Sequence, residues 1–165
     1  MKKLGFIAAL ILFLASCGFH LRGLDGNSQI LPYPTWRIEN AGAMKTPLHD
    51  ELSLYNAKLD SEDDEAAVLR VLDIKTNKET YRLSRIGTVS EYLLTLSVKA
   101  QVLYHGQAQG KPIVVRIEKN FPYSNSNIFG KKAEEDLLWD DMYKDAAQQI
   151  VRMASRTNFS DNAGN

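Results

Sequence analysis

Cysteine is nearly absent from this chain of 165 residues, and its positive and negative charges cancel. One cysteine cannot form an internal disulfide, and no group of cysteines and histidines has the spacing of a zinc site. The 20 lysines and arginines are balanced by 20 aspartates and glutamates, which argues against a nucleic-acid-binding protein. The glycines fit neither a phosphate-binding loop nor a dinucleotide fingerprint. We therefore expect no nucleic acid, no metal and no cofactor.

Side chains that could carry catalysis do not occur in a useful arrangement. His20, His49 and His105 lie in three different local contexts, and we expect none of them to act in catalysis or metal binding. The adjacent carboxylates of Asp140 and Asp141 fall on a highly charged predicted helix, which is typical of a solvated surface. No Gly-x-Ser-x-Gly elbow is present to hold a nucleophilic serine. We therefore expect no catalytic residues and a protein that is not an enzyme.

The N-terminal segment is typical of a bacterial signal peptide. Lys2 and Lys3 precede an apolar run over residues 4–15, which as a helix would span roughly 18 Å and is too short to cross a bilayer. Residues 14–17 read Leu-Ala-Ser-Cys, which resembles the lipobox of bacterial lipoproteins. We interpret residues 1–16 as a cleaved lipoprotein signal peptide and Cys17 as the acylated residue. An ordinary secretory signal with a chance cysteine is the alternative.

The acyl chains expected on Cys17 would anchor the mature protein to a membrane without spanning it. Gly18 follows the cysteine where an aspartate would resemble an inner-membrane retention signal, so we expect outer-membrane sorting. The glycines and prolines that follow predict an acylated tether over residues 17–35. A single domain is expected over residues 36–156, with a flexible polar tail over residues 157–165.

Hydrophobic periodicity predicts the elements of this domain. Alternating apolar residues predict strands over residues 36–39, 67–77, 88–104 and 112–121. Helical spacing predicts helices over residues 47–58 and 132–155. The order βαβββα indicates an α+β fold, a two-layer sandwich in which two helices pack on one face of a four-stranded, mostly antiparallel sheet.

The same patterns predict which side chains are buried. Within the second strand we expect Val68, Leu72 and Ile74 to share a face. Thr46 and Pro47 are expected to cap and begin the first helix. The third strand should bury one alternating set of residues: Leu94, Leu96, Val98, Ala100, Val102 and Tyr104. The long helix should bury the stripe of Leu138, Met142, Ala146, Ile150 and Met153.

Basic residues are scattered beside the predicted sheet. Arginine and lysine bind phosphate through charge-assisted hydrogen bonds, but composition alone does not distinguish such a site from solubilising charges. The residues are Lys75, Lys78, Arg82, Arg85, Lys111, Arg116, Lys119, Lys131 and Lys132.

Three segments resemble the LptE family of lipopolysaccharide-assembly lipoproteins. Residues 17–23 read Cys-Gly-Phe-His-Leu-Arg-Gly, which is similar to the start of the mature proteins of this family. Residues 85–93, Arg-Ile-Gly-Thr-Val-Ser-Glu-Tyr-Leu, and residues 141–150, Asp-Met-Tyr-Lys-Asp-Ala-Ala-Gln-Gln-Ile, also agree in order and spacing. The resemblance runs from Cys17 to about Arg156 and is weaker over residues 24–80.

The resemblance implies a partner and a ligand. LptE-like proteins plug the large outer-membrane β-barrel LptD, help it to fold and help deliver lipopolysaccharide to the outer leaflet. It implies a lipid-anchored protein in the outer membrane, with its domain in the LptD lumen or on the periplasmic side. Two basic positions linked to lipopolysaccharide binding in the family match Arg85 and Lys131, and Lys132 leaves open which lysine matters.

Two other functions fit the same pattern. A lipid-anchored periplasmic adaptor or inhibitor could bind a partner by strand pairing, through an open edge at residues 36–39 or 112–121. A lipid-carrier lipoprotein would instead need a large apolar cavity.

Overall fold

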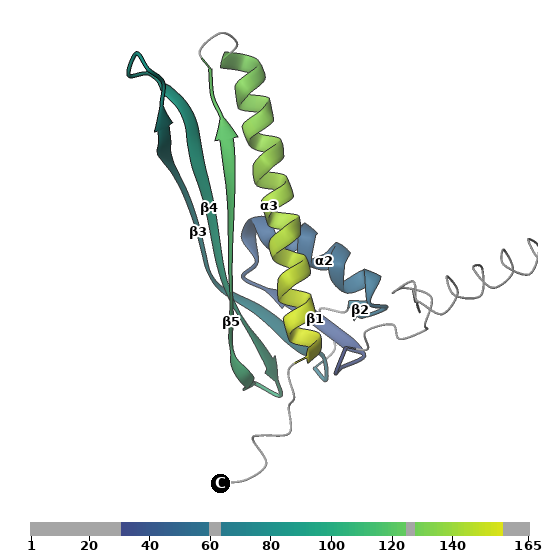
Figure 1. Cartoon of the computed structure of the whole chain (residues 1–165). Helices are drawn as coiled ribbons and strands as arrows, with labels where there is room; N and C mark the ends of the chain where they lie inside the picture. Colours follow the sequence, from purple (N-terminus) through teal and green to yellow (C-terminus); the bar gives the residue numbers. More distant parts are fainter. Residues whose placement is uncertain (1–30, 60–63, 125–127, 157–165) are drawn as a thin grey trace, which may run out of the picture.

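Three long strands and one long helix determine the shape of the molecule (Figure 1). The computed structural model describes residues 31–59, 64–124 and 128–156. The elements are β1 (Thr35–Glu39), η1 (Gly42–Met44), α2 (Lys45–Leu54), β2 (Lys58–Leu59), β3 (Ala67–Leu83), β4 (Val89–Tyr104), β5 (Gln107–Pro122) and α3 (Ile128–Arg156). The predicted signal peptide, Cys17, most of the predicted tether and the predicted tail lie outside the described residues.

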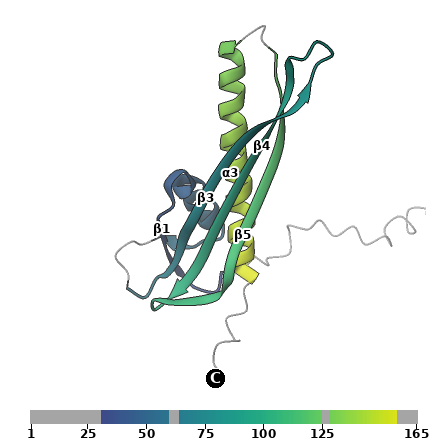
Figure 2. The same cartoon turned by 90° about the vertical axis from the view of Figure 1, so that its left-hand side faces the viewer.

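The described strands form one sheet in the order β2-β1-β3-β4-β5. β1 runs parallel to β2 and β3, whereas β3, β4 and β5 form an antiparallel meander. Both α2 and α3 lie on one face of this sheet, and neither covers the other face (Figure 2). The predicted α+β class with two helices on one face is therefore confirmed.

The prediction of four strands is wrong because β2 adds a fifth. β2 contains only Lys58 and Leu59, which pair with Thr35 and Trp36 of β1. Two residues are too few to show an alternating pattern, so periodicity could not reveal this strand.

The inner face of β4 was predicted well. Its residues Leu94, Leu96 and Val98 are fully buried, and Ala100 and Val102 continue the same side. The core that they enter extends from Leu31 to Ala154 and joins both helices to the sheet. A chain without its first 17 residues therefore keeps this core intact.

A β-bulge in β3 overturns one predicted face. The register shifts between Val71 and Asp73, so that Leu72 is an extra residue relative to β4. Val71 is buried, whereas Leu72 is 48% exposed. The extra residue reverses which side chains face the core, because successive strand residues point to opposite faces. Val68, Leu72 and Ile74 therefore do not share a face, and the bulge places Lys78 opposite Leu94 on the face toward the helices.

The helices begin earlier than predicted. α2 begins at Lys45, and Met44 occupies its N-cap without a side-chain hydrogen bond, so Thr46 does not cap the helix. α3 begins at Ile128 instead of residue 132. In both cases helical backbone continues N-terminal to the residues that carry the recognisable signal.

The buried stripe of α3 is rotated relative to the prediction. Met142, Ala146 and Ile150 are buried as expected, but Met153 is 42% exposed and Ala154 takes its place. The series 142, 146, 150, 154 keeps the four-residue step that remains on one helix face. In the described part of the chain, neither helix has a hydrophobic stretch of the length needed to cross a bilayer.

Candidate functional site

The candidate lipopolysaccharide-binding residues Arg85, Lys131 and Lys132 lie at one end of the molecule. The β3–β4 turn of residues 84–88, the end of β5 and the first turns of α3 all lie at this end, away from β1, β2 and α2 (Figures 1 and 2). We call this region the distal end. Arg85 lies in its turn and Lys131 in the first turn of its helix, so the fold brings to one end two residues that are distant in sequence.

The β3–β4 turn is held by its own backbone and side chains. The Ser84 N–H donates to the Thr88 carbonyl oxygen at 2.7 Å, and the Gly87 N–H donates to the Ser84 carbonyl oxygen at 3.1 Å. The Ser84 and Thr88 hydroxyls lie 2.8 Å apart. Gly87 has a φ of 80°, which glycine adopts without the steric penalty of a side chain. These bonds leave Arg85 and Ile86 exposed at the tip.

Arg85 differs from the other basic residues of the distal end. Arg82 pairs with Glu91 at 3.2 Å, and Lys131 pairs with Glu134 at 2.6 Å. Within the described residues, Arg85 has neither a hydrogen bond nor an ion pair, and no contact joins it to Lys131 or Lys132. Its guanidinium is therefore available to an anion without displacing a carboxylate.

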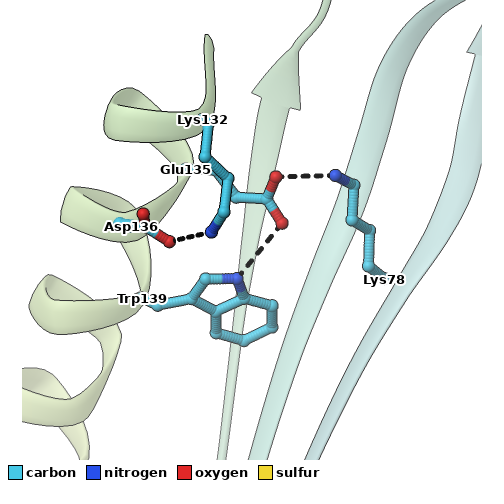
Figure 3. Close-up of polar contacts among 5 residues, drawn as sticks. All are labelled: Lys78, Lys132, Glu135, Asp136 and Trp139. Atoms are coloured by element: carbon cyan, nitrogen blue, oxygen red, sulfur yellow. Dashed lines mark hydrogen bonds and ion pairs between the residues drawn. The ribbon is translucent and has the colours of Figure 1, made fainter. Parts of the chain in front are cut away.

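The two neighbouring lysines of α3 have different surroundings. Lys131 Nζ lies 5.4 Å from the centroid of the Phe121 ring on β5, and its side chain is only 23% exposed. Lys132 is 67% exposed and pairs with Asp136 along the same helix. The hydrogen bond to Asp136 raises the pKa of Lys132. Lys131 thus packs against Phe121 of the sheet. Lys132 pairs with Asp136 of its own helix (Figure 3).

Lys78, one of the basic residues noted beside the predicted sheet, makes contacts that sequence reasoning did not predict. Its Nζ donates to Glu135 Oε2 of α3 at 2.7 Å, and the other carboxylate oxygen of Glu135 accepts from Trp139 Nε1 at 3.4 Å (Figure 3). Lys78 Nζ also lies 4.4 Å from the Tyr92 ring centroid and 5.5 Å from that of Phe121. The Phe121 ring therefore has Lys78 and Lys131 as cationic neighbours. The bulge at Leu72, invisible to a simple alternation rule, is what places Lys78 there.

A second lysine fastens α3 to the sheet. Lys119 lies opposite Leu94 on β5, as Lys78 does on β3. Lys119 Nζ is 2.5 Å from Asp141 Oδ2 and 3.0 Å from Asp145 Oδ2. The hydrogen bond to Asp141 raises the pKa of Lys119, and the same bond lowers the pKa of Asp141. Both lysines that flank Leu94 are therefore ion-paired to acids of α3.

The described residues hold no metal-binding cluster of three or more histidine, cysteine, aspartate or glutamate side chains. His49 contacts Asp50 and His105 contacts Glu65, each at 3.4 Å and each on the surface. His20 lies outside the described residues. The Ser53 hydroxyl donates to the backbone carbonyl oxygen of His49 at 2.8 Å.

Two grooves border α3, and both are lined mainly by exposed side chains. One, of about 230 Å³, lies between α2 and α3 and includes Glu51, Leu54 and Lys144. The other, of about 420 Å³, follows α3 past Leu137 and Asp140. These are open surface features unlike the internal apolar cavity that a lipid carrier would need.

The two predicted strand edges are both partly open. Trp36 of β1 pairs with both β2 and β3, whereas residues 37–39 pair only with β3 among the described strands and leave their other edge open. β5 pairs with β4 alone among the described strands and leaves its other edge open.

Comparison with known proteins identifies a family. A sequence model described as LptE, lipopolysaccharide-assembly, matches residues 33–154. The LPS-assembly lipoprotein LptE of Pectobacterium atrosepticum is 29% identical over 158 residues, covering 94% of this chain and 85% of the relative. The protein of the same name from Yersinia enterocolitica is 32% identical over 148 residues, covering 86% and 70%.

Solved structures agree with this result. The solution structure of lipoprotein B from Nitrosomonas europaea has a TM-score of 0.68 and 30% sequence identity, covering 84% of this chain and 90% of its own. The crystal structure of a minor lipoprotein from Acinetobacter baumannii has a TM-score of 0.65 and 26% identity, covering 76% and 92%. The likeness spans the sheet and helices and is not confined to one motif.

Proposed function

Because this chain belongs to the LptE family of non-enzymatic lipopolysaccharide-assembly lipoproteins, we propose that its distal end binds lipopolysaccharide through Arg85 and Lys131. The observation that carries this proposal is that two basic residues from different elements lie at one end of the domain, one of them without an acidic partner among the described residues. Lipid A phosphates are anions that arginine and lysine bind through charge-assisted hydrogen bonds.

The contacts at the distal end support unequal roles. Arg85 can meet a phosphate directly, whereas Lys131 must exchange Glu134 for the ligand. A surface ion pair contributes only about 0–1 kcal/mol, so this exchange is a small cost. Lys131 is also positioned by Phe121, which keeps its ammonium group near the sheet. Lys132 is a less suitable ligand because, among the described residues, its ion pair is with Asp136 of its own helix and it is not packed against the sheet.

The proposed partner is the LptD β-barrel. The face of the sheet opposite α2 and α3 carries polar side chains, among them Lys75, Lys99 and Arg116. Barrel lumens are polar, so such a face suits a folded body that fills one. Acyl chains on Cys17, added after removal of residues 1–16, would hold the protein at the outer membrane with its domain in the lumen or on the periplasmic side.

Lipopolysaccharide binding is tested with charge-matched variants of the chain without its first 17 residues. Arg85→Asp with Lys131→Asp is expected to weaken binding about tenfold or more. Arg116→Asp with Lys132→Asp changes the net charge equally, but Arg116 lies on β5 and pairs with Glu118 at 2.7 Å. This control should bind as the parent does. Equal binding by both double variants would contradict the assignment.

The partner is tested separately by tagging the C-terminus and solubilising outer membranes in mild detergent. Co-purification of one large β-barrel protein in equal amount is the expected result. An acylated, folded protein that brings down no barrel would refute the plug proposal.

Strand pairing with a periplasmic partner is the second candidate, favoured by the open edges of β5 and of residues 37–39 in β1. Lysines, an arginine and two prolines lie along β5, and such residues discourage edge pairing. A soluble periplasmic partner recovered in place of the barrel would favour this function.

A further inference from the structure

The groove between α2 and α3 has an apolar side that the described part of the chain leaves uncovered. Leu54 of α2 lines this groove and is 75% exposed. Pro47 also lines it, and its spacing of seven residues from Leu54 places both on the same side of the helix. The groove has a volume of about 230 Å³, whereas a cavity of roughly 150 Å³ already takes a benzene ring. It therefore has room for an aromatic side chain.

The same groove carries a carboxylate that is partly withdrawn from water. Glu51 lies between Pro47 and Leu54 in the sequence and lines the groove with them. Burial raises the pKa of Glu51, and the charge of Arg152 on α3 opposes this rise. No ion pair involves Glu51 among the described residues. A cation placed in the groove would therefore reach this carboxylate without displacing another side chain.

A segment of this chain has the matching composition. Residues 18–24 read Gly-Phe-His-Leu-Arg-Gly-Leu, with large apolar side chains, one arginine and no acid. They lie outside the described residues, and neither acylation nor lipopolysaccharide binding assigns them a role. A plain spacer needs no large apolar side chains, because flexible linkers are built from glycine and serine. The composition of this segment therefore indicates that it binds a surface.

The chain joins the domain close to this groove. The Lys58 N–H donates to the Pro34 carbonyl oxygen at 2.9 Å, so Pro34 lies beside the strand that follows α2. Lys58 is four residues after Leu54, a span of at most about 14 Å, whereas the ten residues from Leu24 to Pro34 can span about 35 Å. The segment can therefore reach the groove. Because the contact is intramolecular, its effective concentration is on the order of millimolar, and a weak interaction suffices.

We propose that residues 18–24 dock in the groove between α2 and α3. The Phe19 ring covers Leu54 there. Arg22 pairs with Glu51. The next charge in the chain is negative, at Asp25, and Lys144 lines the groove from α3 as a possible counter-charge. The occupant is thus complementary to the groove in both its apolar and its charged groups.

Docking would orient the domain on the membrane. Phe19 is two residues from Cys17, which is a distance of at most about 7 Å. The side of the domain that carries the groove would then face the leaflet that holds the acyl chains. This consequence rests on the proposed acylation of Cys17, whereas docking itself does not.

Docking is tested by disulfide formation in the chain without its first 17 residues, which retains the segment and contains no cysteine. Leu21→Cys is combined with Leu54→Cys. The matched control combines it with Leu137→Cys, because Leu137 is 69% exposed in the other groove along α3. Under mild oxidation the Leu54 pair should close about tenfold faster or more. Equal rates, or faster closure at Leu137, would overturn the proposal.

Tryptic cleavage after Arg22 gives a second, non-covalent readout. Leu54→Asp should speed this cleavage about fivefold or more, because an undocked segment is open to the protease. Leu137→Asp introduces the same charge and should leave the rate unchanged. Far-UV circular dichroism checks that both variants stay folded. Unchanged cleavage in Leu54→Asp would also overturn the proposal. Neither experiment contains lipopolysaccharide, so their failure is distinguishable from failure of the proposed lipopolysaccharide site.

Discussion

Lys78 of β3 and Glu135 of α3 form an ion pair of 2.7 Å across 57 residues of sequence. The pair joins the distal half of the hairpin to the helix that carries Lys131. Its side chains are 33% and 16% exposed, so solvent screens it less than the other ion pairs of the surface. The same carboxylate accepts a hydrogen bond from Trp139, which fixes its orientation. We infer that this contact helps to hold the distal end in one arrangement.

Replacing Glu135 by alanine should lower the free energy of unfolding by about 1–2 kcal/mol, because Lys78 then remains partly buried without its acceptor. Asp140→Ala changes an exposed acid of the same helix and should cost less than about 0.5 kcal/mol. Urea unfolding followed by circular dichroism compares the two variants. Equal effects would show that the Lys78–Glu135 pair contributes no more than a solvated charge.

The pair of Lys119 and Asp141 predicts a pH dependence. The Asp141 pKa is lowered by Lys119, so its stabilising contribution is present above the unfolded-state pKa and is lost as pH falls through the folded-state pKa. The Lys119 pKa is raised, so its contribution is present below the unfolded-state pKa and is lost only in strong alkali. Asp141→Asn should therefore destabilise the protein at about pH 7, and the difference should shrink as the pH falls through the lowered folded-state pKa of Asp141. A difference that persists in acid would contradict this account.

The bulge in β3 predicts opposite outcomes at two adjacent residues. Val71→Ala should cost about 2 kcal/mol, because Val71 is 3% exposed and its truncation leaves space in the core. Leu72→Ala should cost less than about 0.5 kcal/mol, because Leu72 is largely solvated. Thermal or urea unfolding distinguishes the two. A larger loss of stability for Leu72→Ala than for Val71→Ala would support the face predicted from simple alternation.

Hydrophobic alternation predicted the strand faces that depend only on residues adjacent in sequence. The inner face of β4 could be read from the sequence because its five core residues alternate without interruption. The face of β3 could not, because one extra residue at Leu72 reverses the alternation and depends on pairing with β4. The sequence did not predict β2, because a strand of two residues shows no alternation and forms only through its pairing with β1.

The candidate site was predicted only in part. A resemblance to a family pointed to Arg85 and Lys131, and the fold brings both to the distal end. The role of Lys78 could not be seen, because it depends on the bulge and on Glu135, which is distant in sequence. Whether Lys131 or Lys132 packs on the sheet also depends on the rotation of α3, which hydrophobic spacing defines only approximately.

Single substitutions should separate these two lysines. Lys131→Ala removes the ammonium that packs beside Phe121 and should weaken lipopolysaccharide binding about fivefold, equivalent to about 1 kcal/mol. Lys132→Ala removes a charge already paired with Asp136 and should change binding less than about twofold. Isothermal titration at matched ionic strength measures both. A larger loss of lipopolysaccharide binding for Lys132→Ala than for Lys131→Ala would assign the ligand-binding role to Lys132.

The central claim is that lipopolysaccharide meets this protein at its distal end. A photo-crosslinking amino acid placed at Arg85, at Lys131 or at Val114 of the full chain tests it inside living cells. We expect lipopolysaccharide adducts at Arg85 and at Lys131 and none at Val114, which lies on β5 away from this end. Adducts at Val114 with none at Arg85 and Lys131 would contradict the account.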